Sequence, residues 1–321
     1  MRIGIYKDTL ANKRGADVAV LALAEGLRER GHEVEVFEKP KLLERIKEPW
    51  DVVISTGTNE ILDLAAVYAL RFPWPVVQQF HTNPKSQFKW KKLLRNRAVR
   101  AALRRVDVIQ VLSEEFIPQV VRYGAKVEVI GNWSKFSVQP SSRSEEKVII
   151  YPAAFQTVKR QDLLIRAFAK VSNDFPDWRI RLLGSEGTRH ATACRKLVEK
   201  LGLSDCIAFC GYSGRLDVEY KKCAFVAFPS FAEGFGLVLA DAAMFGKPSL
   251  MIHDWIGLAK AGGGIVTRAT VSAYADGLRR FMSDPELCKT MGAKARDFCA
   301  HTYSREKILD RWERLLLDCS R

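Results

Sequence analysis

The chain has 321 residues, of which 47% are hydrophobic, 27% charged and 10% aromatic. This ordinary globular composition excludes collagen, wholesale disorder and a small disulfide-rich scaffold, and the length predicts about two domains. Lys and Arg number 51 against 37 Asp and Glu, a formal net charge of +14. Such a balance favours an acidic partner, whether a phosphorylated substrate, an anionic lipid or a nucleic acid.

The cysteines and the apolar stretches indicate the compartment. All seven Cys lie in the second half, their number is odd, and Cys206 and Cys210 have no second ligand pair nearby. We therefore expect reduced, mostly structural thiols and no metal site, in a cytoplasmic protein. The first residues read as a strand rather than a signal peptide, and no run of about 18 apolar residues predicts a spanning helix.

The first part of the chain alternates between short apolar runs and helical patterns. Strands are predicted at residues 2–6, 33–37, 51–55, 75–80, 107–112 and 127–130, and helices at 17–30 and 61–70. This alternation predicts a parallel sheet covered by helices, in which ligands bind beyond the carboxyl ends of the strands. A polar stretch with a Pro and four Ser, residues 136–147, is predicted to be a linker.

A second alternation follows the linker. It predicts strands at 148–151, 180–183, 207–210, 225–228 and 249–252, and helices at 161–172, 190–201, 236–245, 271–282 and 285–300, with a last helix at 305–317. We therefore expect an α/β protein with one domain at 1–135, a linker at 136–147, a second domain at 148–302 and a terminal helix at 303–321. A cleft between two such domains is a preferred site for a small molecule.

The most informative motif is the Gly-rich turn after the apolar strand that ends near Phe228. Glu233, Gly234, Phe235 and Gly236 form the turn, and Asp241 follows Glu233 by eight residues. Glycines let a backbone approach a ligand closely, and the N–H groups at a helix start attract phosphate. Ionised carboxylates accept hydrogen bonds from hydroxyls, so a sugar attached to a diphosphate fits this motif. The turn alone would equally serve only to start a helix.

Residues 228–248 resemble the glycosyltransferase family 4 motif, in which a Glu precedes Gly-Phe-Gly and a second Glu follows eight residues later. Further segments are similar to family landmarks in the same order. These are the glycine loop at 14–16, the strand 76–81 that ends in His81, the segment 129–132, the helix start 159–168, the glycine turn 182–187 and the segment 201–211. The resemblance covers nearly the whole chain and is strongest over 148–300.

The resemblance implies a GT-B fold: two Rossmann-like domains facing a central cleft, with a C-terminal helix crossing back to the N-terminal domain. It implies transfer from a nucleotide-diphosphate-sugar with retention, without a metal or cofactor. The implied catalytic residues are Glu233 at the sugar hydroxyls, Lys159 at the leaving diphosphate and His81 near the transferred sugar. The implied donor-binding residues are Gly234, Phe235, Gly236, Leu237, Asp241 at the ribose, Arg160, Gly184 and Tyr212. The implied acceptor-side positions are Gly15, Ala16 and Asn132.

Three positions depart from the family pattern. Asp241 stands where Glu is usual, Ala154 stands where an Arg is usual, and the glycine pair of the first loop is reduced to Gly15-Ala16. Arg160 is a candidate substitute for the missing phosphate cation. Each departure leaves room for altered or weakened activity.

A basic segment, residues 85–105, contains nine Lys and Arg and no acid, interleaved with apolar residues. A basic amphipathic helix is typical of a membrane-surface element. The expected membrane-binding residues are Lys85, Phe88, Lys89, Trp90, Lys91, Lys92 and Arg95. A solvated helix face remains an alternative, and no recognition motif accompanies the patch to favour nucleic acid.

The sequence thus predicts a glycosyltransferase, peripheral on the inner face of the membrane, that uses a lipid-linked or lipopolysaccharide-type glycan acceptor. Two alternatives stay open: a nucleotide-sugar epimerase of the same fold, and a catalytically weak sugar-nucleotide-binding subunit. The sequence disfavours a dinucleotide oxidoreductase, because the loop after the first strand lacks the Gly-x-Gly-x-x-Gly fingerprint.

Overall fold

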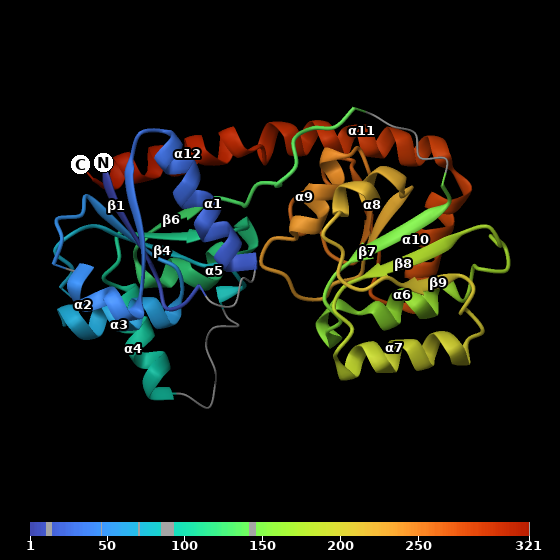
Figure 1. Ribbon diagram of the computed structural model, residues 1–321, viewed down its shortest axis with the longest axis horizontal. Helices are drawn as coiled ribbons and strands as arrows, with labels where there is room; N and C mark the ends of the chain where they lie inside the picture. Colours follow the sequence, from blue (N-terminus) through green and yellow to red (C-terminus); the bar gives the residue numbers. More distant parts are fainter. Residues whose placement is uncertain (11–14, 46, 70, 85–92, 141–145, 321) are drawn as a thin grey trace. The chain divides into compact units, whose positions relative to one another are not determined.

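The computed structural model describes residues 1–10, 15–45, 47–69, 71–84, 93–140 and 146–320 (Figure 1). The chain divides into two compact units. Unit 1 comprises Met1–Asn132 together with Arg305–Arg321, and unit 2 comprises Trp133–Ser304. Each unit contains a six-stranded parallel sheet with helices packed on it, so the α/β class with two Rossmann-like domains is confirmed. None of the described helices is long and apolar enough to cross a membrane.

The sheet of unit 1 has the strand order β2-β1-β3-β4-β5-β6. Its central strands are buried from end to end, as expected for a parallel sheet with both faces covered. The strands are β1 (Arg2–Lys7), β2 (Glu33–Glu38), β3 (Val52–Ser55), β4 (Val76–Gln79), β5 (Val108–Val111) and β6 (Lys126–Val129). The helices are α1 (Gly15–Glu29), α2 (Leu42–Arg45), α3 (Thr58–Tyr68), α4 (Leu93–Leu103), α5 (Ile117–Val120) and α12 (Arg305–Cys319), with short 3-10 turns at Lys39–Lys41, Glu114–Phe116 and Val121–Tyr123.

The last helix, α12, packs on α1 within unit 1, which places the C-terminal segment with the N-terminal half (Figure 1). Its apolar stripe, which includes Trp312, is buried, and Leu309 lies so close to Gly26 that a Cβ there would meet it at 2.6 Å. Arg30 adds ion pairs to Asp310 and Glu313, at 2.7 and 2.8 Å. The C-terminal helix predicted to cross back to the N-terminal domain is therefore confirmed as part of the fold.

The sheet of unit 2 has the order β12-β11-β10-β7-β8-β9. The strands are β7 (Val148–Pro152), β8 (Arg179–Leu183), β9 (Ile207–Phe209), β10 (Phe225–Phe228), β11 (Ser249–Met251) and β12 (Gly264–Val266). The helices are α6 (Gln161–Phe168), α7 (Arg189–Lys200), α8 (Leu216–Lys222), α9 (Leu237–Met244), α10 (Val271–Ser283) and α11 (Pro285–Thr302), with a 3-10 turn at Thr157–Lys159.

The first residues of the predicted linker pack on unit 2. Phe136 makes edge contacts with Tyr220 and Phe245, and the backbone N–H of Gln139 donates to the carbonyl of Met244. The division of the chain consequently falls after Asn132, three residues before the expected end of the first domain. The alternation did not predict β12 or α8, because β12 has only three residues and begins at the last of three glycines, and α8 is a strongly charged segment of seven residues.

One close approach of two backbones holds α11 on α9. A Cβ at Gly292 would overlap the carbonyl oxygen of Gly246, directly after α9, so only glycine fits at this position. We predict that Gly292→Ala lowers the free energy of unfolding by about 1–3 kcal/mol, because the two helices must move apart. Urea denaturation measures the effect. Gly187→Ala is the matched control, since a Cβ there meets nothing within 4 Å. Equal stability of the two variants would contradict the prediction.

Candidate functional site

The glycine-rich turn lies at the point where the strand order of unit 2 reverses. From β7 the chain proceeds through β8 to β9 on one side, and from β10 through β11 to β12 on the other, so β7 and β10 are neighbours. Loops that leave the carboxyl ends of two such strands diverge, and ligands of open parallel sheets bind there. The loop after β7 carries Lys159, and the loop after β10 carries Glu233.

Lys159 and Glu233 form an ion pair, with 2.6 Å between Nζ and Oε1. One further bond joins the two loops, since the N–H of Phe231 donates to the carbonyl of Val158 at 2.7 Å. On the β7 side, the hydroxyl of Tyr151 donates to the carbonyl of Lys159 at 2.8 Å. The two side chains retain 19% and 13% of their exposure. A cation and a carboxylate are therefore fixed side by side at the carboxyl edge while remaining accessible to a ligand.

Tyr151 stabilises the loop that carries Lys159 through its hydroxyl group. Burial raises the pKa of its hydroxyl well above the ordinary value, and the negative charge of Glu233 raises it further. The hydroxyl consequently remains protonated and keeps donating to the Lys159 carbonyl. The backbone of Lys159 is thus held by a hydrogen bond that persists at neutral pH.

The turn itself has the geometry that its glycines predicted. Gly236 adopts a left-handed conformation, with φ of 94°, and α9 begins at the next residue, Leu237, which is half-buried. The ring of Phe235 is buried against Tyr303, with 5.0 Å between centroids. This packing leaves the backbone of Gly234 and Phe235 at the helix start, where N–H groups favour an anion.

The loops after β7, β8 and β9 are joined closely. A Cβ at Gly184 would overlap the carbonyl oxygen of Ala153, and the Gly184 N–H donates to the carbonyl of Gly211 at 2.7 Å. The N–H of Gly211 in turn donates to a carboxylate oxygen of Glu186 at 3.1 Å. The next residue, Tyr212, is 85% exposed. The three loops are therefore held together by hydrogen bonds and a close backbone contact, and Tyr212 adds an exposed aromatic ring.

Asp241 lies in α9 and is buried, with only 7% exposure. The Ser134 hydroxyl donates to its Oδ1 at 2.7 Å and accepts the N–H of Phe136 at 3.0 Å. Burial raises the pKa of Asp241 to about 6, against the opposing effects of the Ser134 bond and of Lys135. Sequence reasoning missed Ser134, because nothing in the spacing links two residues 107 positions apart.

Arg160 has a left-handed backbone, with φ of 53°, and ends the 3-10 turn that begins at Thr157. Its Nε lies 3.5 Å from an oxygen of Asp162. The side chain lines a groove between α6 and α7. Arg160 and Lys159 therefore have different acidic partners, Asp162 and Glu233, although the two residues are adjacent in sequence.

Unit 1 contains a comparable arrangement where its own strand order reverses, between β1 and β3. Lys7, the last residue of β1, pairs with Glu60 of α3 at 2.7 Å and with Asp8 at 2.8 Å. Glu60 is 3% exposed. Neither the alternation of elements nor the motifs indicated this cluster. The sequence signal for the cluster was a lysine at the end of the first strand and an acidic residue in the first turn of the helix that follows the third strand.

His81 follows β4 in unit 1. Both ring nitrogens are buried and have no hydrogen-bond partner within the described residues. Burial lowers the pKa of His81 to about 4, the charge of Lys7 lowers it further, and Asp17 acts in the opposite direction. The ring is therefore neutral near pH 7. Of the acceptor-side positions, Gly15 and Ala16 open α1, and Asn132 is the last residue before the division between the units.

Two family models match the chain and together cover most of it. The model described as glycosyl transferases group 1 matches residues 134–298, and the glycosyl transferase 4-like domain matches residues 39–133. The chain belongs to the group 1 glycosyltransferases. The first match begins at Ser134 and contains the Lys159, Glu233 and Asp241 positions, so the family resemblance inferred from the motifs is confirmed.

Among curated relatives, the glycosyltransferase is 28% identical to an exopolysaccharide phosphotransferase of Streptomyces coelicolor over 223 residues, which are 66% of this chain and 23% of that protein. It is 28% identical to a D-inositol 3-phosphate glycosyltransferase of Kribbella flavida over 200 residues, 55% of this chain and 45% of that protein. The matches thus span less than half the length of these two relatives.

Solved structures share the fold of the glycosyltransferase. The Anabaena protein HepE in complex with UDP has a TM-score of 0.82 at 18% identity, covering 99% of this chain and all (100%) of that one. Sucrose-phosphate synthase from Thermosynechococcus elongatus has a TM-score of 0.79 at 18% identity, covering 99% and 98%. These likenesses support the GT-B fold.

Six of the expected membrane-binding residues of the glycosyltransferase, Lys85, Phe88, Lys89, Trp90, Lys91 and Lys92, lie outside the described residues. The seventh, Arg95, donates to the Thr58 hydroxyl at 2.9 Å and to Asn59 Oδ1 at 2.8 Å, at the start of α3. Part of the basic segment therefore holds two helices of unit 1 together. Leu94, 78% exposed, and the exposed Arg97, Arg104 and Arg105 lie on or just after α4.

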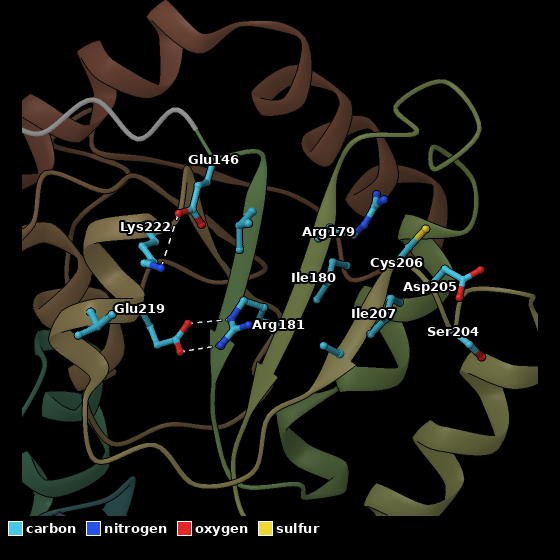
Figure 2. A pocket seen from close by; sticks show the side chains of 13 residues that line it. Glu146, Arg179, Ile180, Arg181, Ser204, Asp205, Cys206, Ile207, Glu219 and Lys222 are labelled. Carbon is cyan, nitrogen blue, oxygen red and sulfur yellow. Dashed lines mark hydrogen bonds and ion pairs between the residues drawn. The ribbon is translucent and has the colours of Figure 1, made fainter.

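A hollow of about 470 Å³ lies beside the first residues of β7, β8 and β9, away from the carboxyl ends that carry the motif (Figure 2). Four of its charged side chains form pairs: Arg181 makes two bonds of 2.8 Å to Glu219, and Lys222 lies 3.8 Å from Glu146. The hollow is therefore separate from the candidate site. Its Arg181–Glu219 pair provides a control for mutations of the candidate site.

The buried Asp241 gives the glycosyltransferase a specific pH dependence. Because the folded-state pKa, about 6, lies above the ordinary 3.8, folding takes up a proton between these pH values. The stability that protonation supplies is complete below pH 4 and is lost as the pH rises through 6. We predict that the stability of the wild type relative to Asp241→Asn falls over this range, by about 3 kcal/mol at most.

Urea denaturation of both proteins from pH 4 to 7 measures this difference. Ser134→Ala removes a bond that lowers the pKa, so its loss of stability should occur at higher pH. Lys135, Tyr220 and Cys299 also interact with the carboxyl and stay unchanged in these variants. A difference between wild type and Asp241→Asn that is constant with pH would refute the assignment.

Proposed function

We propose that this glycosyltransferase moves a sugar from a nucleotide-diphosphate-sugar to a hydroxyl of a lipid-linked or lipopolysaccharide-type glycan, with UDP-sugars as the first donors to test. The observation that carries the donor side is the Lys159–Glu233 pair at the carboxyl edge of β7 and β10. Support for UDP comes from the structural neighbour HepE, solved with UDP and with UDP-glucose. The basic segment at residues 85–105 supports an acceptor located at a membrane surface, without identifying the glycan.

In this proposal the donor separates the ion pair. The diphosphate takes the Lys159 ammonium and the N–H groups at the start of α9, and the sugar hydroxyls donate to Glu233. Negative charge grows on the diphosphate as the bond to the sugar breaks, and a preorganised cation and helix start stabilise it. A charge-assisted hydrogen bond of this kind contributes about 1.5–3 kcal/mol. Asp241 accepts from the ribose hydroxyls, and Gly184 and Tyr212 line the nucleotide.

We further propose that transfer proceeds with retention and without a metal or cofactor. The leaving phosphate oxygen takes the acceptor proton, so no side chain need act as the base. The neutral His81 ring, whose buried nitrogens lack partners within the described residues, is assigned to the transferred sugar. Glu60 and Asp8 in unit 1 offer carboxylate oxygens to acceptor hydroxyls.

Removing either member of the Lys159–Glu233 pair tests the donor site. We expect Lys159→Gln and Glu233→Gln each to lower turnover by about 100-fold or more, because the first removes the diphosphate cation and the second a sugar contact. The assay follows UDP release and the anomeric proton of the product by NMR, in the presence of EDTA. Glu219→Gln breaks an ion pair of the same unit outside the site and should retain activity.

Several outcomes would redirect the proposal. Unchanged turnover in both variants would refute the site, and an inverted anomer or a requirement for a divalent ion would refute the mechanism. A changed sugar without any acceptor would identify an epimerase. Nucleotide binding without turnover in the wild type would identify a binding subunit.

We also propose that the glycosyltransferase acts from the cytoplasm, peripherally on the inner face of the membrane. The exposed Arg97, Arg104 and Arg105 follow the exposed Leu94, and α4 contains no acidic residue. Each basic residue near an anionic surface contributes about 1 kcal/mol, which salt reduces.

We predict that replacing Arg97, Arg104 and Arg105 together by Gln weakens binding to phosphatidylserine vesicles by about tenfold or more, as measured by vesicle sedimentation. The control replaces Lys221, Arg268 and Lys289, three exposed cations of unit 2, by Gln and removes the same charge. An equal loss in both variants would mean that net charge alone attracts the protein, which would contradict a specific membrane face.

A further inference from the structure

A basic groove of about 490 Å³ runs between α6 and α7 on unit 2. The two helices lie side by side on the same face of the sheet (Figure 1). Four Lys and Arg side chains line the groove, namely Arg160, Arg166, Lys196 and Lys200, together with His190, against the single carboxylate of Asp162. The buried Cys194 lies among the lining residues.

Three of the four Lys and Arg side chains of this groove lack an acidic partner among the described residues. Arg160 pairs with Asp162, whereas Arg166, Lys196 and Lys200 make no ion pair with any described residue. The neighbouring Arg195 on α7, by contrast, pairs with Glu186. Cations gathered without counterions repel one another, and a concave surface focuses their potential on an incoming anion. The groove therefore has the charge pattern of a site for a multiply charged anion.

The direction of the groove favours an extended ligand. Both helices follow strands of the parallel sheet, so Arg160 and His190 lie at the carboxyl edge, while Arg166 and Lys200 lie further along their helices. The stretch of α7 from His190 to Lys200 rises about 15 Å. Arg160 directly follows Lys159, so the groove starts next to the candidate donor site and leads away from it.

We infer that the α6–α7 groove binds an anionic glycan, a chain of sugars that carries carboxylate, sulfate or phosphate groups. This inference rests on the proposed function only in taking the polyanion to be a glycan. The described residues that line the groove include no Phe, Tyr or Trp, whereas single-stranded nucleic acids are held mainly by stacking on such rings. The groove would hold part of an acceptor or product while the candidate donor site remains accessible.

The test measures binding of a fluorescent heparin-derived hexasaccharide to the full chain by anisotropy. The groove variant combines Arg166→Gln, Lys196→Gln and Lys200→Gln, none of which belongs to the donor site. The matched control combines Lys221→Gln, Arg268→Gln and Lys289→Gln. We expect the groove variant to bind about tenfold more weakly than the control and the wild type, with a smaller dependence on salt. Neutral dextran should not bind.

Three outcomes would overturn the inference: no binding to the wild type, equal weakening in both variants, or single-stranded DNA bound through the groove as tightly as the hexasaccharide. UDP-sugar turnover is measured in parallel on the wild type and the groove variant. Without added glycan, both should hydrolyse the donor equally, because the substituted residues do not belong to the Lys159–Glu233 pair. Absent turnover with groove-dependent binding would refute the proposed function and leave the glycan site standing.

Discussion

The candidate site depends on one constraint, the adjacency of β7 and β10 in the parallel sheet of unit 2. These strands are separated by 72 residues between the end of one and the start of the other, yet their carboxyl ends meet where the strand order reverses. The loops that leave them diverge, and the space they open is bounded by Lys159 from one side and Glu233 from the other. The opposite charges meet because the topology brings them together.

The same constraint operates in unit 1. Lys7 ends β1 and Glu60 opens the helix after β3, and these two strands are neighbours where that sheet reverses. In both units a lysine from one loop neutralises a glutamate from the other, which makes a buried or half-buried carboxylate tolerable. Each pair also fixes the orientation of its carboxylate. A polar ligand can then exchange partners with the pair instead of having to desolvate isolated charges.

The sequence predicted the features that depend on neighbouring residues, and it did not predict the features that join distant parts of the chain. The strand and helix alternation is local, and it predicted both sheets, the positions of most elements and the motif at 233–241. The short β12, which begins at the last of three glycines, has too weak a periodic signal to be predicted. The Ser134–Asp241 bond and the cluster around Lys7 join residues far apart in the chain, so they follow only from the fold. Arg160 lies 3.5 Å from Asp162, a neighbour two residues away, and its role at the phosphate stays a prediction.

The surroundings of Asp241 explain why Asp is compatible with the fold at a position where the family usually has Glu. A carboxylate at 7% exposure is costly unless hydrogen-bonded, and Ser134 supplies a bond from the segment that enters unit 2. Phe136, two residues on, packs on Tyr220 and Phe245, which fixes that segment against α9. The carboxylate therefore has a structural partner as well as its proposed ribose contact. A donor that binds there must share Asp241 with Ser134, so the strength of the Ser134 bond bears directly on how tightly the nucleotide is held.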